Sequence, residues 1–452
     1  MKAQAEAATR HRQAMAESGS RLGWLYDQVT GDEDARVCKD IPDAACRHQP
    51  RNFFAYLVAN LLGKIGDELA SARLILPWLL GALGAPAAFA GFLVPVREAG
   101  VLLPQLLVAA YVRNKPHRKG VWLLGAVLTA FALFLLAGVA WGLDGATAGW
   151  AVLGLVALFS LARGLCSVSA KDVLGKTVSK TRRGVLMGYS AGLAGFATLL
   201  VGGYIQARGA QFDDVGFIAG LLVVAGALWL LAAAVFAAIQ EAPGATEGGG
   251  NALAAAFASL GILRTDAEFR RYVVNRALLL SVALAPPFYV LLAQQRTGSD
   301  LASLGLLVIA SSLAASLSSP LLGRLGDRSS RMVIALGAGL AAVTGGATWA
   351  LVEADAALMA HTWSFAALYV LISLAHSAVR LGRKIYLVDL GNGGSRSAYV
   401  AVSNTVIGVL MLAGGLVGVV ADRFGVPVAL LLLAAVSLMA AVHALRLPEV
   451  SG

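Results

Sequence analysis

The residues of this chain best suited to chemistry are charged side chains inside long apolar segments. Residues 60–73 read NLLGKIGDELASAR and hold Lys64, Asp67 and Glu68 near the centre of the first such segment. At 100° per residue, Asn60, Lys64 and Asp67 fall within about 60° of arc on a helix, with Glu68 at the edge of that face. Inside a membrane, carboxylates and cations at such positions serve as proton relays and binding groups. We therefore expect this face to contact water or binding partners.

A neutralised stripe without a binding role is the alternative for the same helix. Lys64 is three or four residues from Asp67 and Glu68, the spacing at which side chains pair on a helix. Each central Lys, Asp or Arg costs roughly 2.5–3.5 kcal/mol to insert into a bilayer, so both interpretations keep these groups away from lipid. Arg73 points almost opposite to this face, and we expect it to serve packing or to reach the outer interface.

The second apolar segment carries Arg97 and Glu98 near its midpoint. Adjacent residues do not face each other on a helix, so these two side chains need separate partners. We expect Arg97 to meet a carboxylate of the first segment and Glu98 to be a titrating group.

Two later segments present matching polar faces at helical spacing. The faces consist of Ser160, Arg163, Ser167 and Lys171 in one segment and of Ser373, His376, Arg380 and Lys384 in the other. A histidine in a membrane can change its charge near neutral pH, although a neutral, hydrogen-bonded one is an equal alternative. We expect an asymmetric cavity in which carboxylates carry protons and Arg and His side chains bind a negative group.

An internal repeat relates these segments. A shift of 213 residues, the separation of Lys115 from Arg328, superimposes charged and glycine landmarks along both halves of the chain. The matched pairs are Lys115 and Arg328, Arg118 and Arg331, Ser160 and Ser373, Lys171 and Lys384, Arg183 and Arg396, Gly195 and Gly408, and Gly202 and Gly415. Two parallel copies of a six-span unit form one class of transporter, whose solute site lies between the copies at mid-membrane.

Composition indicates lipid as the solvent, because 58% of the residues are hydrophobic and only 14% are charged. Soluble domains keep about a quarter of their residues charged. We predict an all-α membrane protein with twelve transmembrane helices in two six-helix bundles. The predicted spans are 53–80, 86–112, 119–142, 148–170, 184–207, 215–240, 272–295, 301–322, 332–353, 362–386, 397–421 and 425–447.

The net charge of +10 is distributed over alternate loops, which argues against nucleic acid as a partner. Loops rich in Lys and Arg mark the cytoplasmic side, so both termini are expected in the cytoplasm. Residues 1–50 lack the apolar core of a signal peptide and are predicted to be a cytoplasmic tail. The N-terminal bundle is predicted at 51–240, a cytoplasmic linker at 241–271 and the C-terminal bundle at 272–452.

No cofactor and no metal are expected. Cys38, Cys46 and His48 are three potential ligands without a fourth at zinc spacing, so we interpret the two cysteines as reduced thiols of the tail. Nucleotide-binding loops, nucleophile elbows and paired metal-binding histidines are missing from the sequence, so no enzyme is expected.

A glycine, an Asp-Arg pair and a further Arg occur in the stretch Gly323-Arg-Leu-Gly-Asp327-Arg328-Ser-Ser-Arg331, between the eighth and ninth predicted spans. This stretch is similar to the cytoplasmic loop signature of the major facilitator superfamily, with Ser330 in place of the usual glycine, and residues 51–447 resemble that family. In the N-terminal copy of this loop, Asn114 replaces the acidic residue. Arg163 resembles the arginine in span four that the family often associates with proton coupling.

The resemblance implies a secondary transporter of the cytoplasmic (inner) membrane that moves a small organic solute by alternating access. We expect proton coupling, an anionic or zwitterionic solute and a monomer. The predicted pathway residues are Asn60, Lys64, Asp67, Glu68, Arg97, Glu98, Arg163, His376 and Arg380, and the predicted gating motif is Gly323, Asp327, Arg328 and Arg331. Multidrug efflux is an alternative within the class; a membrane sensor without transport or an intramembrane enzyme is an alternative outside it.

Overall fold

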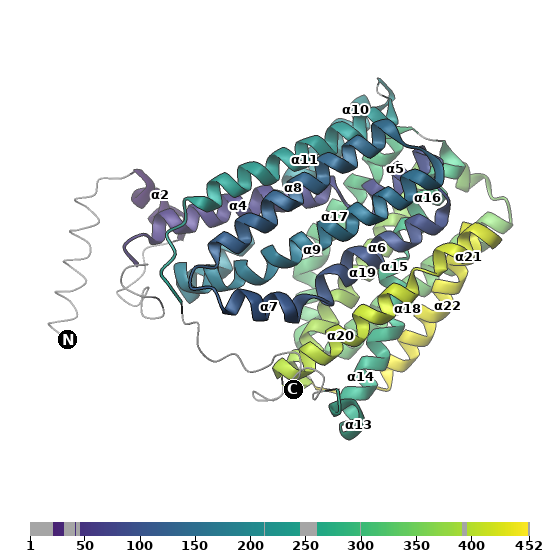
Figure 1. The fold of residues 1–452 in the computed structure, drawn as a ribbon. Helices are drawn as coiled ribbons and strands as arrows, with labels where there is room; N and C mark the ends of the chain where they lie inside the picture. The colour runs from purple at the N-terminus through teal and green to yellow at the C-terminus, as the bar shows by residue number, and fades with distance from the viewer. Residues whose placement is uncertain are drawn as a thin grey trace.

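The computed structural model describes residues 21–30, 41, 46–211, 213–244, 260–298, 300–390 and 396–450. All regular secondary structure in these ranges is helical (Figure 1). Ten helices of the described part are long and apolar enough to cross a membrane. The fold class is therefore a helical membrane protein, and the count of twelve spans in two six-helix bundles stays a prediction.

We call residues 46–244 the N-half and residues 260–450 the C-half. The N-half contains α4 (Gln49–Leu69), α5 (Ile75–Ala82), α6 (Ala87–Leu102), α7 (Gln105–Arg113), α8 (Lys119–Gly142), α9 (Gly145–Thr177), α10 (Lys180–Arg208) and α11 (Asp214–Ala237). The C-half contains α14 (Ala267–Leu278), α15 (Leu280–Leu284), α16 (Pro286–Thr297), α17 (Leu301–Arg328), α18 (Ser330–Glu353), α19 (Thr362–Leu390), α20 (Arg396–Gly414), α21 (Val417–Phe424) and α22 (Val426–Leu445). Short helices are α2 (Arg21–Thr30), α13 (Ile262–Thr265), η1 (Gly209–Gln211) and η2 (Ala357–Ala360).

Four predicted spans, the first, second, seventh and eleventh, are interrupted in the structure. Pro287 follows Pro286 at the start of α16, and Pro104 separates α6 from α7, because proline removes a helical hydrogen bond. The first span is divided into α4 and α5. The seventh span begins with α14 at Ala267, within the predicted linker.

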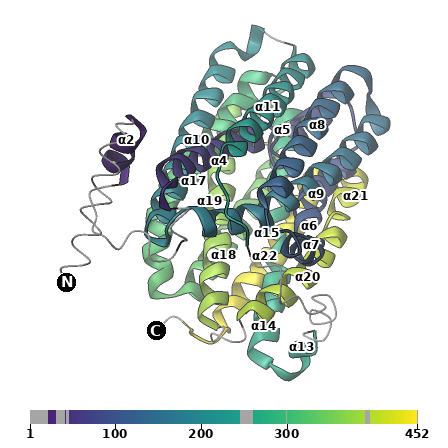
Figure 2. The same ribbon diagram turned by 60° about the vertical axis from the view of Figure 1, so that its left-hand side comes forward.

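Each half packs mostly on itself. In the N-half α8 lies between α9 and α11, and α4 packs on α10 and α11; in the C-half α18 lies between α19 and α22 (Figure 2). Trp122 stacks on Phe236 with ring centroids 3.8 Å apart, inside the N-half. Large apolar side chains such as Phe131, Leu336 and Val343 are exposed on the outside, as expected for surfaces that face acyl chains.

The halves meet along two seams, α10 against α17 and α6 against α20 and α21. We call the end of the molecule that carries the loops 113–119, 177–180 and 328–330 the basic end, and the opposite end the far end. Gly188, Gly195 and Gly202 recur every seven residues and so share one face of α10. A Cβ on Gly202, nearest the far end, would lie 3.0 Å from Val308 of α17. A Cβ on Gly195 would lie 4.0 Å from Ser316, and one on Gly188 would meet no heavy atom of the described residues within 4 Å.

The other seam is also closest toward the far end. A Cβ on Gly91 of α6 would lie 2.5 Å from the Gly418 Cα of α21. The Ala88 N–H donates to Asp422 Oδ2 at 3.1 Å in the same region. The two halves are therefore closed against each other at the far end, and α10 diverges from α17 toward the basic end.

Part of the N-terminal tail is folded onto the N-half. Gln49 Nε2 donates to the Tyr26 hydroxyl at 2.8 Å and to Ser179 Oγ at 3.0 Å, which ties α2 to the turn before α10. Cys46 is disulfide-bonded, so the expectation of a reduced thiol there is wrong. Cys38 lies outside the described residues.

Candidate functional site

The first membrane segment is broken at its centre, and this break builds the middle of the site. α4 ends at Leu69 and α5 begins at Ile75. Pro77 has no N–H to donate to the Arg73 carbonyl four residues earlier, which favours an interruption at this point. The hydroxyl of Tyr369 on α19 donates to that carbonyl at 3.3 Å. The break therefore joins the N-half to the C-half.

Arg73 lies inside the break and is turned toward the second segment. Its Nη2 donates to Glu98 Oε1 at 2.8 Å, and the two side chains are 30% and 40% exposed. The expectation that Arg73 serves packing or reaches the outer interface is therefore wrong. It assumed a continuous helix, whereas the interruption at Ala70–Leu74 redirects the side chain.

Asp67 makes the second ion pair of the site. Its Oδ2 accepts from Arg163 Nη2 at 2.8 Å and from Nε at 3.1 Å, which joins α4 to α9. The Arg163 guanidinium also lies 4.2 Å from the centre of the Trp229 ring. The other carboxylate oxygen of Asp67 is buried without a hydrogen-bond partner. This oxygen, Asp67 Oδ1, can therefore accept a proton or a hydrogen bond.

The other charged residues of the first two segments are not paired in this way. Among the described residues, Lys64 and the exposed Glu68 have no ion-pair partner within 4 Å, so the pairing of Lys64 with Asp67 or Glu68 does not form. The Arg97 guanidinium lies over the Phe159 ring at 4.5 Å and interacts electrostatically with Asp67 of the first segment, without an ion pair within 4 Å among the described residues. Asn60 Nδ2 donates to Ser190 Oγ on α10 at 2.8 Å.

The polar face of α19 lies opposite these groups. Arg380 interacts electrostatically with Arg73, Glu98 and Glu68 of the N-half. Both ring nitrogens of His376 are buried and have no hydrogen-bond partner in the part of the chain that the structure describes. The structure thus brings Glu68, Glu98 and Arg380 together from both halves.

Sequence reasoning missed three residues of this region. Tyr369 reaches the break, as described above. Arg383 lies one turn beyond Arg380 and shares its electrostatic environment. Arg276 of α14 is 7% exposed and donates to Ser403 Oγ and to Asn404 Oδ1, the latter at 2.9 Å. An arginine within a predicted span was the available signal for Arg276.

The predicted gating motif lies at the basic end. Arg328 is exposed, and Arg331 Nε pairs with Glu449 Oε2 at 2.8 Å in the C-terminal segment. The side chain of Asp327 and the surroundings of Gly323 lie outside the part that the structure describes. Within that part, the motif makes no ion pair with the N-half.

The equivalent loop of the N-half is anchored internally. The backbone N–H groups of Arg118 and Lys119 donate to the Glu241 carboxylate at 2.9 and 2.7 Å, and the Arg118 guanidinium pairs with Asp172. Lys176 Nζ bridges Asp172 at 2.9 Å and Glu241 at 3.2 Å. Asp172 and Glu241 thus supply the negative charge that Asn114 lacks.

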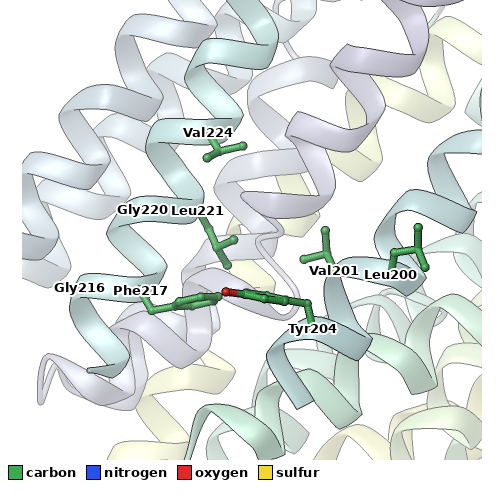
Figure 3. A pocket seen from close by; sticks show the side chains of 8 residues that line it. All are labelled: Leu200, Val201, Tyr204, Gly216, Phe217, Gly220, Leu221 and Val224. Carbon is green, nitrogen blue, oxygen red and sulfur yellow. The ribbon is translucent and has the colours of Figure 1, made fainter. Parts of the chain in front are cut away.

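A pocket of about 550 Å³ lies apart from this site, between α10 and α11 (Figure 3). Its lining is apolar except for the Tyr204 hydroxyl, and the rings of Tyr204 and Phe217 lie edge to edge across it. A charged solute has no partner there. No group of three potential metal ligands occurs among the described residues.

The charged centre has the features of a polar transport site rather than of a structural core. Two arginine–carboxylate pairs from different helices are partly exposed at the middle of membrane segments, and cations of the other half face them. Such pairs can exchange partners, because a proton on the carboxylate releases the arginine.

Comparison with known proteins finds a family match in the C-half and transporters with the same fold. Residues 277–451 match the sequence model of the Major Facilitator Superfamily. A transporter of the POT family solved with a thioalcohol-conjugated peptide has a TM-score of 0.67 at 13% identity, covering 90% of this chain and 98% of that one. A D-xylose–proton symporter has a TM-score of 0.64 at 15% identity, covering 88% and 97%.

A relative by sequence is an uncharacterized protein of Mycobacterium tuberculosis, 23% identical over 415 residues, which are 88% of this chain and 78% of the relative. The C-half of the chain thus matches the family model of the Major Facilitator Superfamily, and the chain as a whole has the fold of these solved transporters.

Proposed function

We propose that this protein moves a small organic solute with a negative group across the membrane by alternating access, coupled to protons. This proposal rests on two ion pairs, Arg163–Asp67 and Arg73–Glu98, which lie beside the cations of α19. Unpaired charges at mid-membrane are costly and mark solute and ion pathways. The named coupling ion of the xylose–proton symporter, a structural neighbour, supports protons as the second cargo.

The coupling follows from competition for arginine. When Glu98 is ionised, its Oε1 accepts a hydrogen bond from Arg73 Nη2 at 2.8 Å, so the Arg73 guanidinium is already paired. A proton on Glu98 removes that attraction, so Arg73 becomes available to a solute anion that faces Arg380. Asp67 and Arg163 form a second pair of the same kind, and Glu68 is the unpaired carboxylate beside them. Proton and anion therefore enter together in this scheme.

Alternating access supplies the movement. The halves act as the two moving bundles, and the described conformation is closed at the far end and diverges toward the basic end. Because basic loops mark the cytoplasm, this conformation is open to the cytoplasm of a bacterial-type inner membrane, and we propose a monomer. Asp327, Arg328 and Arg331 then stabilise the state that is closed to the cytoplasm.

The test uses purified protein in proteoliposomes with an internal pH dye. A metabolite screen by thermal stabilisation first selects a solute. We expect a pH gradient to drive accumulation of that solute, and a protonophore to abolish it. Glu98→Gln should lose gradient-driven accumulation but keep exchange of solute across the vesicle membrane, whereas Glu353→Gln at the far end is the matched control. Accumulation that survives both the protonophore and Glu98→Gln would exclude proton coupling.

A further inference from the structure

The C-half side of the site carries an excess of positive charge. The electrostatic environment of His376 is set by Arg73, Arg380 and Arg383. Lys384 interacts electrostatically with Arg380, Arg383 and Lys171, and with Glu98 of the N-half. In the described part of the chain, neither Arg380 nor Arg383 has a carboxylate within 4 Å.

Arg276 adds a buried guanidinium to the same place. The Tyr272 hydroxyl donates to the Arg383 carbonyl at 3.0 Å, which fixes α14 against α19. Arg276 follows Tyr272 by one helical turn and so shares its face, and its charge interacts with that of Arg383. Neutral partners, Ser403 and Asn404, hold two of its nitrogens.

The remaining donors of this region are unused. Arg276 Nε and both nitrogens of His376 are buried without hydrogen-bond partners among the described residues. Asn404 Nδ2 also reaches Gln105 Oε1 of the N-half at 3.5 Å, so the Arg276 environment continues across the seam. Arg276 is buried, Arg383 is half-buried and Arg380 is exposed, and none of these guanidinium groups has a carboxylate within 4 Å among the described residues. An anion with several oxygens would satisfy both these charges and the unused donors.

The N-half carboxylates do not balance this charge. Glu98 is already paired with Arg73. Glu68 has no ion-pair partner within 4 Å among the described residues and interacts with Arg380 only electrostatically over a longer distance. One negative charge on a solute would offset only one of Arg276, Arg380 and Arg383. Two charges match the two guanidinium groups that lack an acidic partner within 4 Å on α19.

We propose that the solute carries a doubly charged oxyanion, bound by Arg380 and Arg383 of α19 together with Arg276 of α14. This assignment rests on the proposed transport function and adds the charge of the solute and the residues that select it. Guanidinium groups bind carboxylate and phosphate oxygens in bidentate fashion, so the shared chemistry covers phosphate monoesters and dicarboxylates.

The experiment measures thermal stabilisation and equilibrium affinity of the purified full chain at constant ionic strength and neutral pH. The doubly charged probes are inorganic phosphate, phenyl phosphate and succinate, and the singly charged controls are dimethyl phosphate and acetate. We expect at least one doubly charged probe to stabilise the protein while its singly charged counterpart does not. Stabilisation by phosphates alone or by succinate alone identifies the source of the oxyanion.

Arg383→Gln should weaken the affinity for that probe about tenfold to a hundredfold, because each hydrogen bond to a charged group is worth that factor. Arg423→Gln, an exposed arginine at the far end, is the matched control and should leave the affinity unchanged. Arg276 also links α14 to α20, so a truncated side chain would disturb the packing of these helices. Arg276→Lys retains the positive charge and most of the side-chain volume, and it tests whether the bidentate guanidinium geometry is needed.

Two results would overturn the assignment: equal stabilisation by singly and doubly charged probes, or equal affinities of Arg383→Gln and Arg423→Gln. The failure of the transport function is recognised separately. If no doubly charged probe binds but a solute from the metabolite screen accumulates in a protonophore-sensitive way, transport stands and the oxyanion assignment falls. If a doubly charged probe binds but no pH gradient moves it, proton coupling falls instead.

Discussion

Replacing Asp67 by Asn tests whether the pair with Arg163 serves both stability and coupling. The two side chains are 24% and 21% exposed, and the Asp67 carboxylate accepts two hydrogen bonds from the guanidinium. Removing one partner of a fully buried pair costs about 3–5 kcal/mol, and an exposed pair contributes about 0–1 kcal/mol. Because Asn keeps one acceptor oxygen and the site is partly exposed, we expect Asp67→Asn to lower the free energy of unfolding by about 2–3 kcal/mol.

The double variant separates charge balance from packing. Asp67→Asn combined with Arg163→Gln leaves no uncompensated charge, so much of the lost stability should return. The matched control is Asp355→Asn, which removes the far-end pair with Arg296 at 3.4 Å, where Asp355 is 92% exposed. That control should leave the unfolding transition unchanged.

Chemical unfolding followed by tryptophan fluorescence measures stability, and proteoliposome assays compare gradient-driven uptake with solute exchange. We expect Asp67→Asn to lose gradient-driven uptake more strongly than exchange. If its stability matches that of Asp355→Asn and its gradient-driven uptake matches that of the wild type, the reasoning about this pair is refuted.

Three further perturbations test separate parts of the structure. Gly202→Leu should force the two halves apart at the far end, and Gly188→Leu should hold the basic end open. Cysteine labelling of the two variants should therefore shift in opposite directions. A shift in the same direction would contradict the divergence of α10 from α17. Tyr369→Phe leaves the Arg73 carbonyl without its donor and should lower unfolding free energy by about 1 kcal/mol, with unchanged stability as the contrary result. The Phe269 N–H and the Tyr399 hydroxyl lower the pKa of the Asp266 carboxyl. Asp266→Ala should cost about 1 kcal/mol at neutral pH, and the difference from wild type should vanish as the pH falls through that lowered pKa; a difference that persists in acid would contradict this origin.

Apolar length made most of the fold predictable. The predicted span 119–142 coincides with α8, and other long segments agree within several residues, because about 20 apolar residues are needed to cross a bilayer. The division of the first span was missed because residues 69–75 are themselves mostly apolar. Pro77, whose missing N–H frees the Arg73 carbonyl, was the signal for it.

The charged residues of the site could be identified from the sequence, because a charge within an apolar segment has a high free-energy cost. Their partners could not be identified in this way. Helical spacing offered Lys64 as an alternative partner for Asp67 within its own helix, whereas the structure supplies Arg163 from α9. Local spacing contains no information on which helices become neighbours, so the pairing of Arg73 with Glu98 was equally inaccessible. Arg276 follows the polar Asn275 within the seventh predicted span, and the free-energy cost of placing its charge there was a signal that the predicted site did not use.

Double electron–electron resonance on one sample set tests alternating access around the charged centre most directly. Spin labels at positions 181 and 324 report the basic end, and labels at 208 and 300 report the far end, in a background without the native cysteines. On acidification from neutral pH to about pH 4, where carboxyl groups of ordinary pKa are substantially protonated, we predict that the basic-end distance shortens while the far-end distance lengthens. Distances that stay fixed at both ends, or that change in the same direction, would contradict a carrier whose halves rock about these ion pairs.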